Sequence, residues 1–193
     1  EEMNPQSSIS FQRFIYDTIL SSPSKDSTRK NKMSTLSLLS QFRPGLSFKG
    51  ITPTLIHYFE NFLYEKGHKV NTVAKHMKHL KSFVNSAIDQ GHIRIQDYPF
   101  QRYKAKRAKG KSTHLLPEEI QKLENLVLSG RAQSLTHTLE AFLFCCYTGL
   151  RYSDFVNMTE NNLKIIEGKP WLIFHTVKTG TEVKLPLSFL FDG

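Results

Sequence analysis

The stretch "NTVAKHMKHLKSFVNSAIDQG", residues 71–91, predicts the fold of the chain most clearly. Its apolar residues recur at helical spacing and form one stripe, whereas the opposite face is polar and basic. The apolar stripe consists of Val73, Met77, Leu80, Val84, Ala87 and Ile88, and the other face carries Lys75, Lys78, His79 and Ser82. We therefore expect a long amphipathic helix that Asn71 caps and that ends near Gly91.

The outer face of this helix contains no acidic residue before Asp89. A helix face that meets only water usually mixes charges of both signs. The pattern therefore favours contact with nucleic acid, and an ordinary basic surface on a helical domain is the alternative.

Three further patterns of helical spacing precede this stretch. The first has Phe11, Phe14, Ile15 and Ile19; the second has Leu36, Leu39 and Phe42 after Asp26 or Ser27 as the N-cap; the third runs from Thr52-Pro53 through Leu55, Tyr58, Phe59, Phe62 and Leu63 to Gly67. Together they predict a four-helix domain over residues 1–101.

Residues 102–111, "RYKAKRAKGK", are rich in Lys and Arg and contain no acid. We interpret residues 102–114 as an exposed basic linker between two domains. The tail "AKRAKGKS" lacks the first glycine of a phosphate-binding loop, because Ala105 occupies that position, and no apolar strand precedes it. The sequence therefore excludes a nucleotide-binding loop there.

Residues 115–193 combine helices and strands. A helix is expected after Leu116-Pro117-Glu118-Glu119, with Ile120, Leu123, Leu126 and Val127 on its core face, and another over about 133–147. After Asn161, the segments "LKIIE", "WLIFHTV" and "VKLPL" predict three short strands joined by tight turns, the second with Lys178 near its middle. The predicted fold class is mainly α with a small β-sheet (α+β).

The positive charge is concentrated in the first part of the chain. Residues 1–111 hold 19 Lys and Arg against 8 Asp and Glu, whereas residues 112–193 hold 7 against 9, for a net charge of +9 overall. Such an asymmetry indicates a basic module with a polyanionic partner.

The composition is that of a globular protein, with 39% hydrophobic and 22% charged residues. No apolar run has the length of a membrane span, and the start of the chain lacks the pattern of a signal peptide. Cys145 and Cys146 are adjacent in an apolar run, which favours reduced thiols and an intracellular, cytoplasmic protein. His76 and His79 have helical metal-ligand spacing but no third ligand nearby, so we expect neither a metal site nor a cofactor.

Arg151 and Lys178 are the residues most suited to phosphate chemistry. Guanidinium binds a phosphate through two parallel hydrogen bonds, and a lysine at a hairpin tip can approach from another direction. A helix start and a hairpin could thus converge on one phosphodiester. Local physics also allows each to be a solvated surface charge.

The residues around both positions resemble a known family. "EAFLFCCYTGLRYSDFVNMT" looks like the first active-site motif of the tyrosine recombinases, the phage-integrase family, with its T-G-x-R-x-x-E/D pattern. "WLIFHTVKTGTEVKLPL" resembles the β-hairpin of that family, and "LLPEEIQKLENLV" resembles the helix that opens its catalytic domain. The upstream helices resemble the core-binding domain of integrases from bacterial mobile elements.

The resemblance implies roles for three residues. Arg151 would bind a non-bridging oxygen of the scissile phosphate, and Lys178 would protonate the departing 5′-oxygen. Asp154 would support the active-site cations, although an acid in the first turn of a helix explains this position equally well. The family reaction proceeds through a 3′-phosphotyrosine and needs no metal.

The resemblance also implies double-stranded DNA as partner, with self-association on DNA in the full-length protein. The helices of the first domain and the basic linker would contact mainly phosphates, through Arg29, Lys32, Lys75, Lys78, His79, Ser82, Lys104, Lys106 and Arg107. In a bacterial cell such a protein would lie in the cytoplasm, on the nucleoid when bound to DNA.

The sequence departs from the family pattern in one respect. The later His-x-x-Arg pair and the nucleophilic tyrosine have no counterpart before Gly193. We therefore expect a fragment that lacks the C-terminal half of the catalytic domain, with residues 115–193 as its first half, and that does not cleave DNA alone. The alternatives are a non-catalytic DNA-binding regulator on an integrase scaffold, and a basic helical or RNA-binding module in which Arg151 and Lys178 do not converge.

Overall fold

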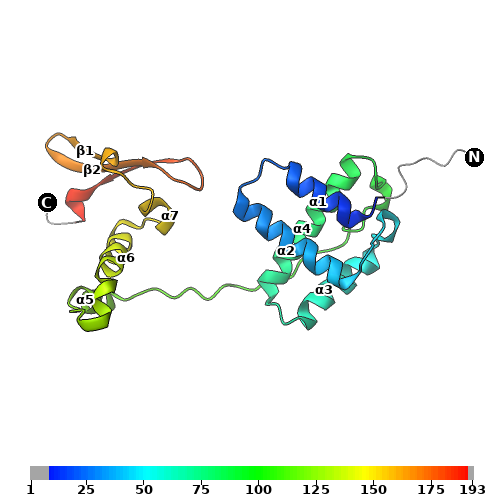
Figure 1. The fold of residues 1–193 in the computed structure, drawn as a ribbon, viewed down its shortest axis with the longest axis horizontal. Coiled ribbons are helices and arrows are strands. Elements are labelled where there is room, and N and C mark those ends of the chain that lie inside the picture. Colours follow the sequence, from blue (N-terminus) through cyan, green and yellow to red (C-terminus); the bar gives the residue numbers. More distant parts are fainter. Residues whose placement is uncertain (1–8, 191–193) are drawn as a thin grey trace, which may run out of the picture. The chain divides into compact units, whose positions relative to one another are not determined.

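The computed structural model describes residues 9–190 and divides the chain into two compact units, Glu1–Lys111 and Ser112–Gly193. Figure 1 shows helices throughout the first unit, and helices followed by a small sheet in the second. The first unit contains α1 (Phe11–Ser21), α2 (Asp26–Phe42), α3 (Pro53–Glu65) and α4 (Val70–Asp89), with short 3-10 helices at Phe48–Gly50 and Ile95–Asp97.

The apolar faces of α1 to α4 meet in one core. Helix α2 contacts the other three, and α3 packs against α4. The most deeply buried side chains of this core are Phe11, Ile15, Ile19, Leu39, Ile56, Phe59, Leu63, Val73, Met77, Leu80, Phe83, Val84, Ala87 and Phe100. The apolar stripe predicted for residues 71–91 is confirmed, with Ile88 only partly buried at its end.

Side-chain caps fix the starts of α1 and α3. The Ser10 hydroxyl accepts a 3.2 Å hydrogen bond from the Arg13 N–H, and Thr52 accepts one of the same length from Leu55. Pro53 occupies the first turn of α3, where its missing N–H costs no helical bond. The predicted start of this helix is confirmed.

Two predicted caps are wrong. Helix α2 already begins at Asp26 with Lys25 as N-cap, and α4 begins at Val70 with Lys69 as N-cap. Asn71 therefore lies inside α4. Its carboxamide bonds the backbone of Ala108 and is not used as a helix cap.

The second unit contains helices and a three-stranded sheet. Its elements are α5 (Pro117–Glu124), α6 (Thr136–Thr148), α7 (Tyr152–Phe155), β1 (Leu163–Ile166), β2 (Lys169–His175) and β3 (Glu182–Pro186), with 3-10 helices at Gly130–Leu135, Glu160–Asn162 and Leu187–Phe189. The strands are antiparallel in the order β1-β2-β3. In the register, Leu163 faces Leu172, and His175 faces Glu182 next to the turn of the second hairpin. The predicted strands and turns are confirmed.

The second unit buries little apolar surface. Within residues 112–190, the deeply buried apolar side chains are Leu172 and Phe174 of β2. Leu126 and Val127 were expected in the core of the first helix of this unit, but they are 48% and 88% exposed. That prediction is wrong because α5 ends at Glu124, so neither residue continues its helical face.

The predicted fold class, mainly α with a small β-sheet, is confirmed. Among residues 9–190, no helix combines the length and the apolarity that a bilayer span requires. Cys145 and Cys146 are free thiols that lie half-buried in α6, where burial raises the pKa of Cys145.

Candidate functional site

The chain turns sharply between α6 and α7, and this turn presents Arg151. The Thr148 hydroxyl donates a 2.6 Å hydrogen bond to the Phe144 carbonyl, and the Gly149 N–H donates to Cys145 at 3.0 Å. Gly149 has a φ of 66°, a left-handed conformation that favours glycine at a helix end. Arg151 then takes an extended conformation as N-cap of α7. Thr148 and Gly149 thus have a local structural role, because they end α6 and turn the chain before Arg151.

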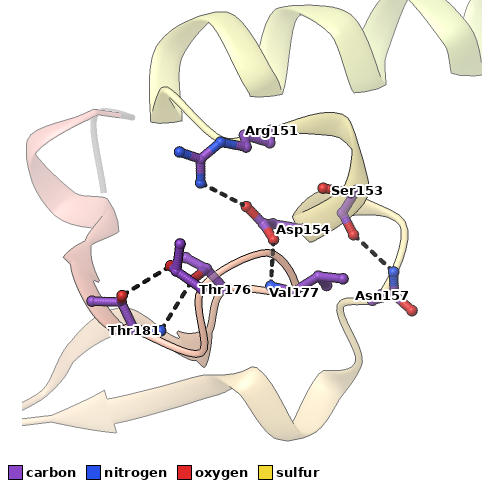
Figure 2. Close-up of polar contacts among 8 residues, drawn as sticks. Arg151, Ser153, Asp154, Asn157, Thr176, Val177 and Thr181 are labelled. Atoms are coloured by element: carbon purple, nitrogen blue, oxygen red, sulfur yellow. Dashed lines mark hydrogen bonds and ion pairs between the residues drawn. The ribbon is translucent and has the colours of Figure 1, made fainter. Parts of the chain in front are cut away.

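Asp154 connects this turn to the second hairpin. Its side chain is 2% exposed, and its Oδ1 accepts a 2.8 Å hydrogen bond from the Val177 N–H. Its Oδ2 lies 3.8 Å from Nη1 of Arg151. Figure 2 shows the carboxylate between Arg151 on one side and Val177 on the other. Asp154 also lies in the first turn of α7, as its interpretation as a helix first-turn acid expects.

Threonine hydroxyls organise the turn that carries Lys178. The Thr176 N–H donates to the Thr181 carbonyl at 2.9 Å, and the Thr181 N–H donates to the Thr176 hydroxyl at 3.1 Å (Figure 2). The Thr179 hydroxyl lies 2.7 Å from that of Thr176 and 2.9 Å from that of Thr181. The side chain of Lys178 is exposed at the tip of this ordered turn.

The structure therefore brings the Arg151 turn and the Lys178 hairpin together at Asp154. Arg151 keeps 58% of its side chain exposed, so its guanidinium remains accessible. Asp154 thus links the accessible Arg151 guanidinium to the backbone of the turn that carries the exposed Lys178. Exposed cations of this kind can bind a phosphate.

A second group of candidate residues lies where α2 contacts α4. Lys75 of α4 donates a 3.3 Å hydrogen bond from Nζ to Oδ1 of Asn31 on α2. Lys78 and Ser82 are exposed, and Lys32 of α2 is half-buried and close enough to His79 to help lower its pKa. These cations from two helices form one basic surface, which we call the α2–α4 surface.

A cluster of Thr35, His76 and His79 connects α2 to α4 beneath the α2–α4 surface. The Thr35 hydroxyl lies 2.8 Å from Nδ1 of His76 and 2.8 Å from Nδ1 of His79, and it contacts the Asn31 carbonyl at 3.3 Å. A hydroxyl donates only one hydrogen, so at least one of the histidines donates through Nδ1–H. Burial, followed by the charge of Lys75, lowers the pKa of His76 to about 4. The same two causes lower the pKa of His79.

His79 and Arg29, two of the predicted DNA contacts, are only partly exposed and also make contacts within the first unit. His79 is half-buried, with Nδ1 bonded to Thr35, which leaves Nε2 as its outer atom. The Arg29 guanidinium donates a 3.0 Å hydrogen bond to the Ser22 carbonyl and lies 3.6 Å from Asp26. Arg29 therefore also stabilises the loop between α1 and α2.

The basic segment, residues 102–111, carries the remaining candidates. Lys104, Lys106 and Arg107 are exposed. The segment has no helix or strand, but hydrogen bonds to α3 and α4 hold it at two points. Sequence reasoning missed the residues responsible, Glu60 and Asn71, because no local pattern indicates which backbone a distant side chain will bond.

Metal binding has no support in the described part of the chain. Across residues 9–190, no group of three or more His, Cys, Asp and Glu side chains could hold a metal ion. His76 and His79 are bonded to Thr35 through Nδ1.

Comparison with known proteins identifies the family. The model of the phage integrase SAM-like domain matches residues 10–106, about half of the chain. The chain belongs to the phage integrase SAM-like domain family. This confirms the resemblance to tyrosine recombinases of the phage-integrase type. No curated protein sequence matches this integrase-family chain.

Solved structures of integrases share the fold. A lambda integrase tetramer bound to a Holliday junction matches with a TM-score of 0.73 and 22% identity over 95% of this chain and 52% of that chain. A lambda integrase dimer bound to a COC′ core site matches with a TM-score of 0.74 and 22% identity over 97% of this chain and 53% of that chain. The Tn1549 transposon integrase in complex with transposon right end DNA matches with a TM-score of 0.72 and 16% identity over 92% of this chain and 61% of that chain. The chain thus spans about half to six-tenths of the length of these integrases.

Proposed function

We propose that the chain binds double-stranded DNA as part of a site-specific tyrosine recombinase. The α2–α4 surface and the basic segment contact phosphates of the duplex and fix its position. The observation that carries this proposal is the gathering of Lys32, Lys75 and Lys78 on one surface whose α4 part has no acid before Asp89.

The second unit contributes the phosphate site at Asp154. In the proposed reaction, Arg151 binds a non-bridging oxygen of the scissile phosphate and Lys178 protonates the departing 5′-oxygen. Asp154 positions the segments that carry these two residues, because its carboxylate contacts the Arg151 guanidinium and the backbone N–H of Val177, next to Lys178. Donors that face developing charge contribute most when they are held in place beforehand.

The nucleophile of that reaction is not assigned to a tyrosine near Arg151. The Tyr147 hydroxyl donates a hydrogen bond to Glu124 of α5, so Tyr147 has a structural role. Tyr152 lies at the start of α7. Strand cleavage therefore belongs to the proposed complete protein, as do self-association on DNA and a place on the nucleoid.

Duplex binding by the chain tests the proposal. We compare the chain with Lys78→Ala and with Lys49→Ala on a fluorescently labelled duplex, by anisotropy at low salt. Lys49 is a matched control, since it is exposed in the 3-10 helix Phe48–Gly50, outside the α2–α4 surface. Lys78→Ala should weaken binding roughly tenfold, as expected for one charged hydrogen bond, and Lys49→Ala much less.

Equal effects of the two substitutions would show that binding follows net charge and not the α2–α4 surface. For the phosphate site, Arg151→Ala and Lys178→Ala should each reduce the log–log salt slope by about one unit. If both leave the slope unchanged while Lys78→Ala reduces it, the chain binds DNA through its first unit only, as a non-catalytic regulator would.

A further inference from the structure

The basic segment is anchored to the body of the first unit at two points. At its start, the Tyr103 hydroxyl donates a 2.9 Å hydrogen bond to Oε1 of Glu60 on α3. Near its end, Asn71 Nδ2 donates to the Ala108 carbonyl at 2.9 Å, and the Ala108 N–H donates to Asn71 Oδ1 at 3.0 Å. The residues between these anchors include Lys104, Lys106 and Arg107.

The first anchor is largely buried. Glu60 is 8% exposed, and a carboxylate with so little access to water needs a hydrogen-bond partner. The Tyr103 ring also packs edge-on against Phe100, with ring centroids 5.5 Å apart. Burial and the bond to Glu60 raise the pKa of Tyr103, so its hydroxyl keeps the hydrogen that it donates.

The second anchor uses both polar groups of one carboxamide. An asparagine side chain offers one acceptor and two donors, so it can pair with the N–H and the C=O of a single residue. Both bonds to Ala108 are formed, and each has ordinary length. This pairing fixes the backbone of the basic segment and not merely one of its side chains.

Asn71 belongs to the same face of α4 as the candidate DNA contacts. Residues 71, 75, 78 and 82 are spaced by four, three and four positions, which places them in one line along a helix. Ala108 therefore lies at the N-terminal end of the line formed by Lys75, Lys78 and Ser82. Its neighbours Arg107 and Lys109 add their charges there.

We propose that Asn71 is a positioning residue that docks the basic segment onto the end of the α2–α4 surface, so that a DNA duplex meets one continuous row of cations. This inference rests on the proposed function. A free basic arm loses conformational entropy when DNA orders it, whereas a docked arm has already lost it. Docking therefore raises affinity without adding a charge.

This role has a signature that a direct phosphate contact lacks. The log–log salt slope counts neutralised phosphates, and Asn71 carries no charge. Asn71→Ala should therefore weaken duplex binding roughly threefold to tenfold, since several long side chains then pay the cost of ordering, while the slope stays unchanged. Asn61→Ala is the matched control, because Asn61 is an exposed asparagine on α3, outside the α2–α4 surface.

A second variant breaks the same contact from the other side. Ala108→Pro removes the N–H that donates to Asn71 and changes no charge. If the two residues act through one contact, the double variant should bind no more weakly than Asn71→Ala alone. Hydrogen exchange of the Ala108 amide should also speed up in Asn71→Ala, with the far-UV circular dichroism of the chain unchanged.

The outcomes separate this inference from the function on which it rests. If the unaltered chain does not bind a duplex, the proposed function fails and this inference fails with it. If the chain binds but Asn71→Ala matches Asn61→Ala, or lowers the slope by a full unit, or adds its effect to that of Ala108→Pro, only the positioning role is overturned.

Discussion

The carboxylate of Asp154 accepts a 2.8 Å hydrogen bond from the backbone N–H of Val177, a residue 23 positions later in the chain. The same carboxylate lies 3.8 Å from the Arg151 guanidinium. One buried acid thus holds a helix start and a hairpin turn together, and the next residue of that turn is Lys178. This side chain links the two segments of the candidate phosphate site.

Asp154→Ala should destabilise the second unit by about 1–3 kcal/mol, because the substitution removes the partner of a part-buried N–H. Asp154→Asn keeps an oxygen acceptor and should cost less. Hydrogen exchange of the Val177 amide measures the effect directly, and it should become much faster in Asp154→Ala. An unchanged exchange rate would show that the contact does not order the turn.

Gly149→Ala should cost about 1–2 kcal/mol, because an L-residue is forced into the left-handed conformation at the end of α6. No atom lies within 4 Å of the added Cβ, so the cost comes from the backbone and not from a clash. Gly110→Ala is the control, since its Cβ also meets nothing within 4 Å and its φ is not positive. If the second unit had the same unfolding free energy in both variants, this explanation of the turn would be contradicted.

The second unit should unfold at lower denaturant concentration than the first. The reason is the difference between the large helical core of residues 11–100 and the few deeply buried apolar side chains described for residues 112–190. Trp171 is the single tryptophan of the chain and lies in β2, so its fluorescence reports the second unit. Far-UV circular dichroism reports mostly the longer helices of the first. Coincident transitions would contradict the prediction.

The first unit should lose stability as the pH falls from about 6.5 towards 4. His76 is 2% exposed, and its pKa falls from 6.5 to about 4 in the folded state, so between these values the unfolded chain binds a proton that the folded chain excludes. The free energy of unfolding should then fall by at most about 1.4 kcal/mol per pH unit, and level off above the unfolded pKa.

The charged and titratable groups around His76 favour its neutral form. Lys75, His68 and His79 are positive or can become so, and Thr35 of α2 is neutral. Comparing the chain with His76→Leu isolates this contribution from that of carboxylates, and the exposed His114→Ala serves as control. If His76→Leu retains the full pH dependence between 6.5 and 4, another group is responsible.

The sequence predicts most secondary structure of this chain because its signals are local. The apolar stripe of α4, the Thr52-Pro53 start of α3 and the turn around Lys178 each depend on residues close together in the chain. The errors occur where a local signal is weak or is overridden. Nothing strong marks the end of α5 at Glu124, and Asn71 bonds Ala108, which lies 37 positions away.

The candidate site depends on contacts that sequence reasoning does not reach. Asp154 was open to two interpretations, because the partner that holds it, Val177, arrives through tertiary packing. The family resemblance implies that Arg151 and Lys178 act together, whereas local physics only permits it. The half-buried state of His79 follows from Thr35 on another helix, which the pattern of α4 alone cannot indicate.

The salt dependence of duplex binding tests the central claim most directly. The equilibrium association constant of the chain for a DNA duplex would be measured from about 50 to 200 mM salt. If the α2–α4 surface and the basic segment together neutralise at least three phosphates, the log–log slope should be about −3 or steeper. A slope near zero, or no binding at the low-salt end, would contradict the assignment of this basic surface to DNA.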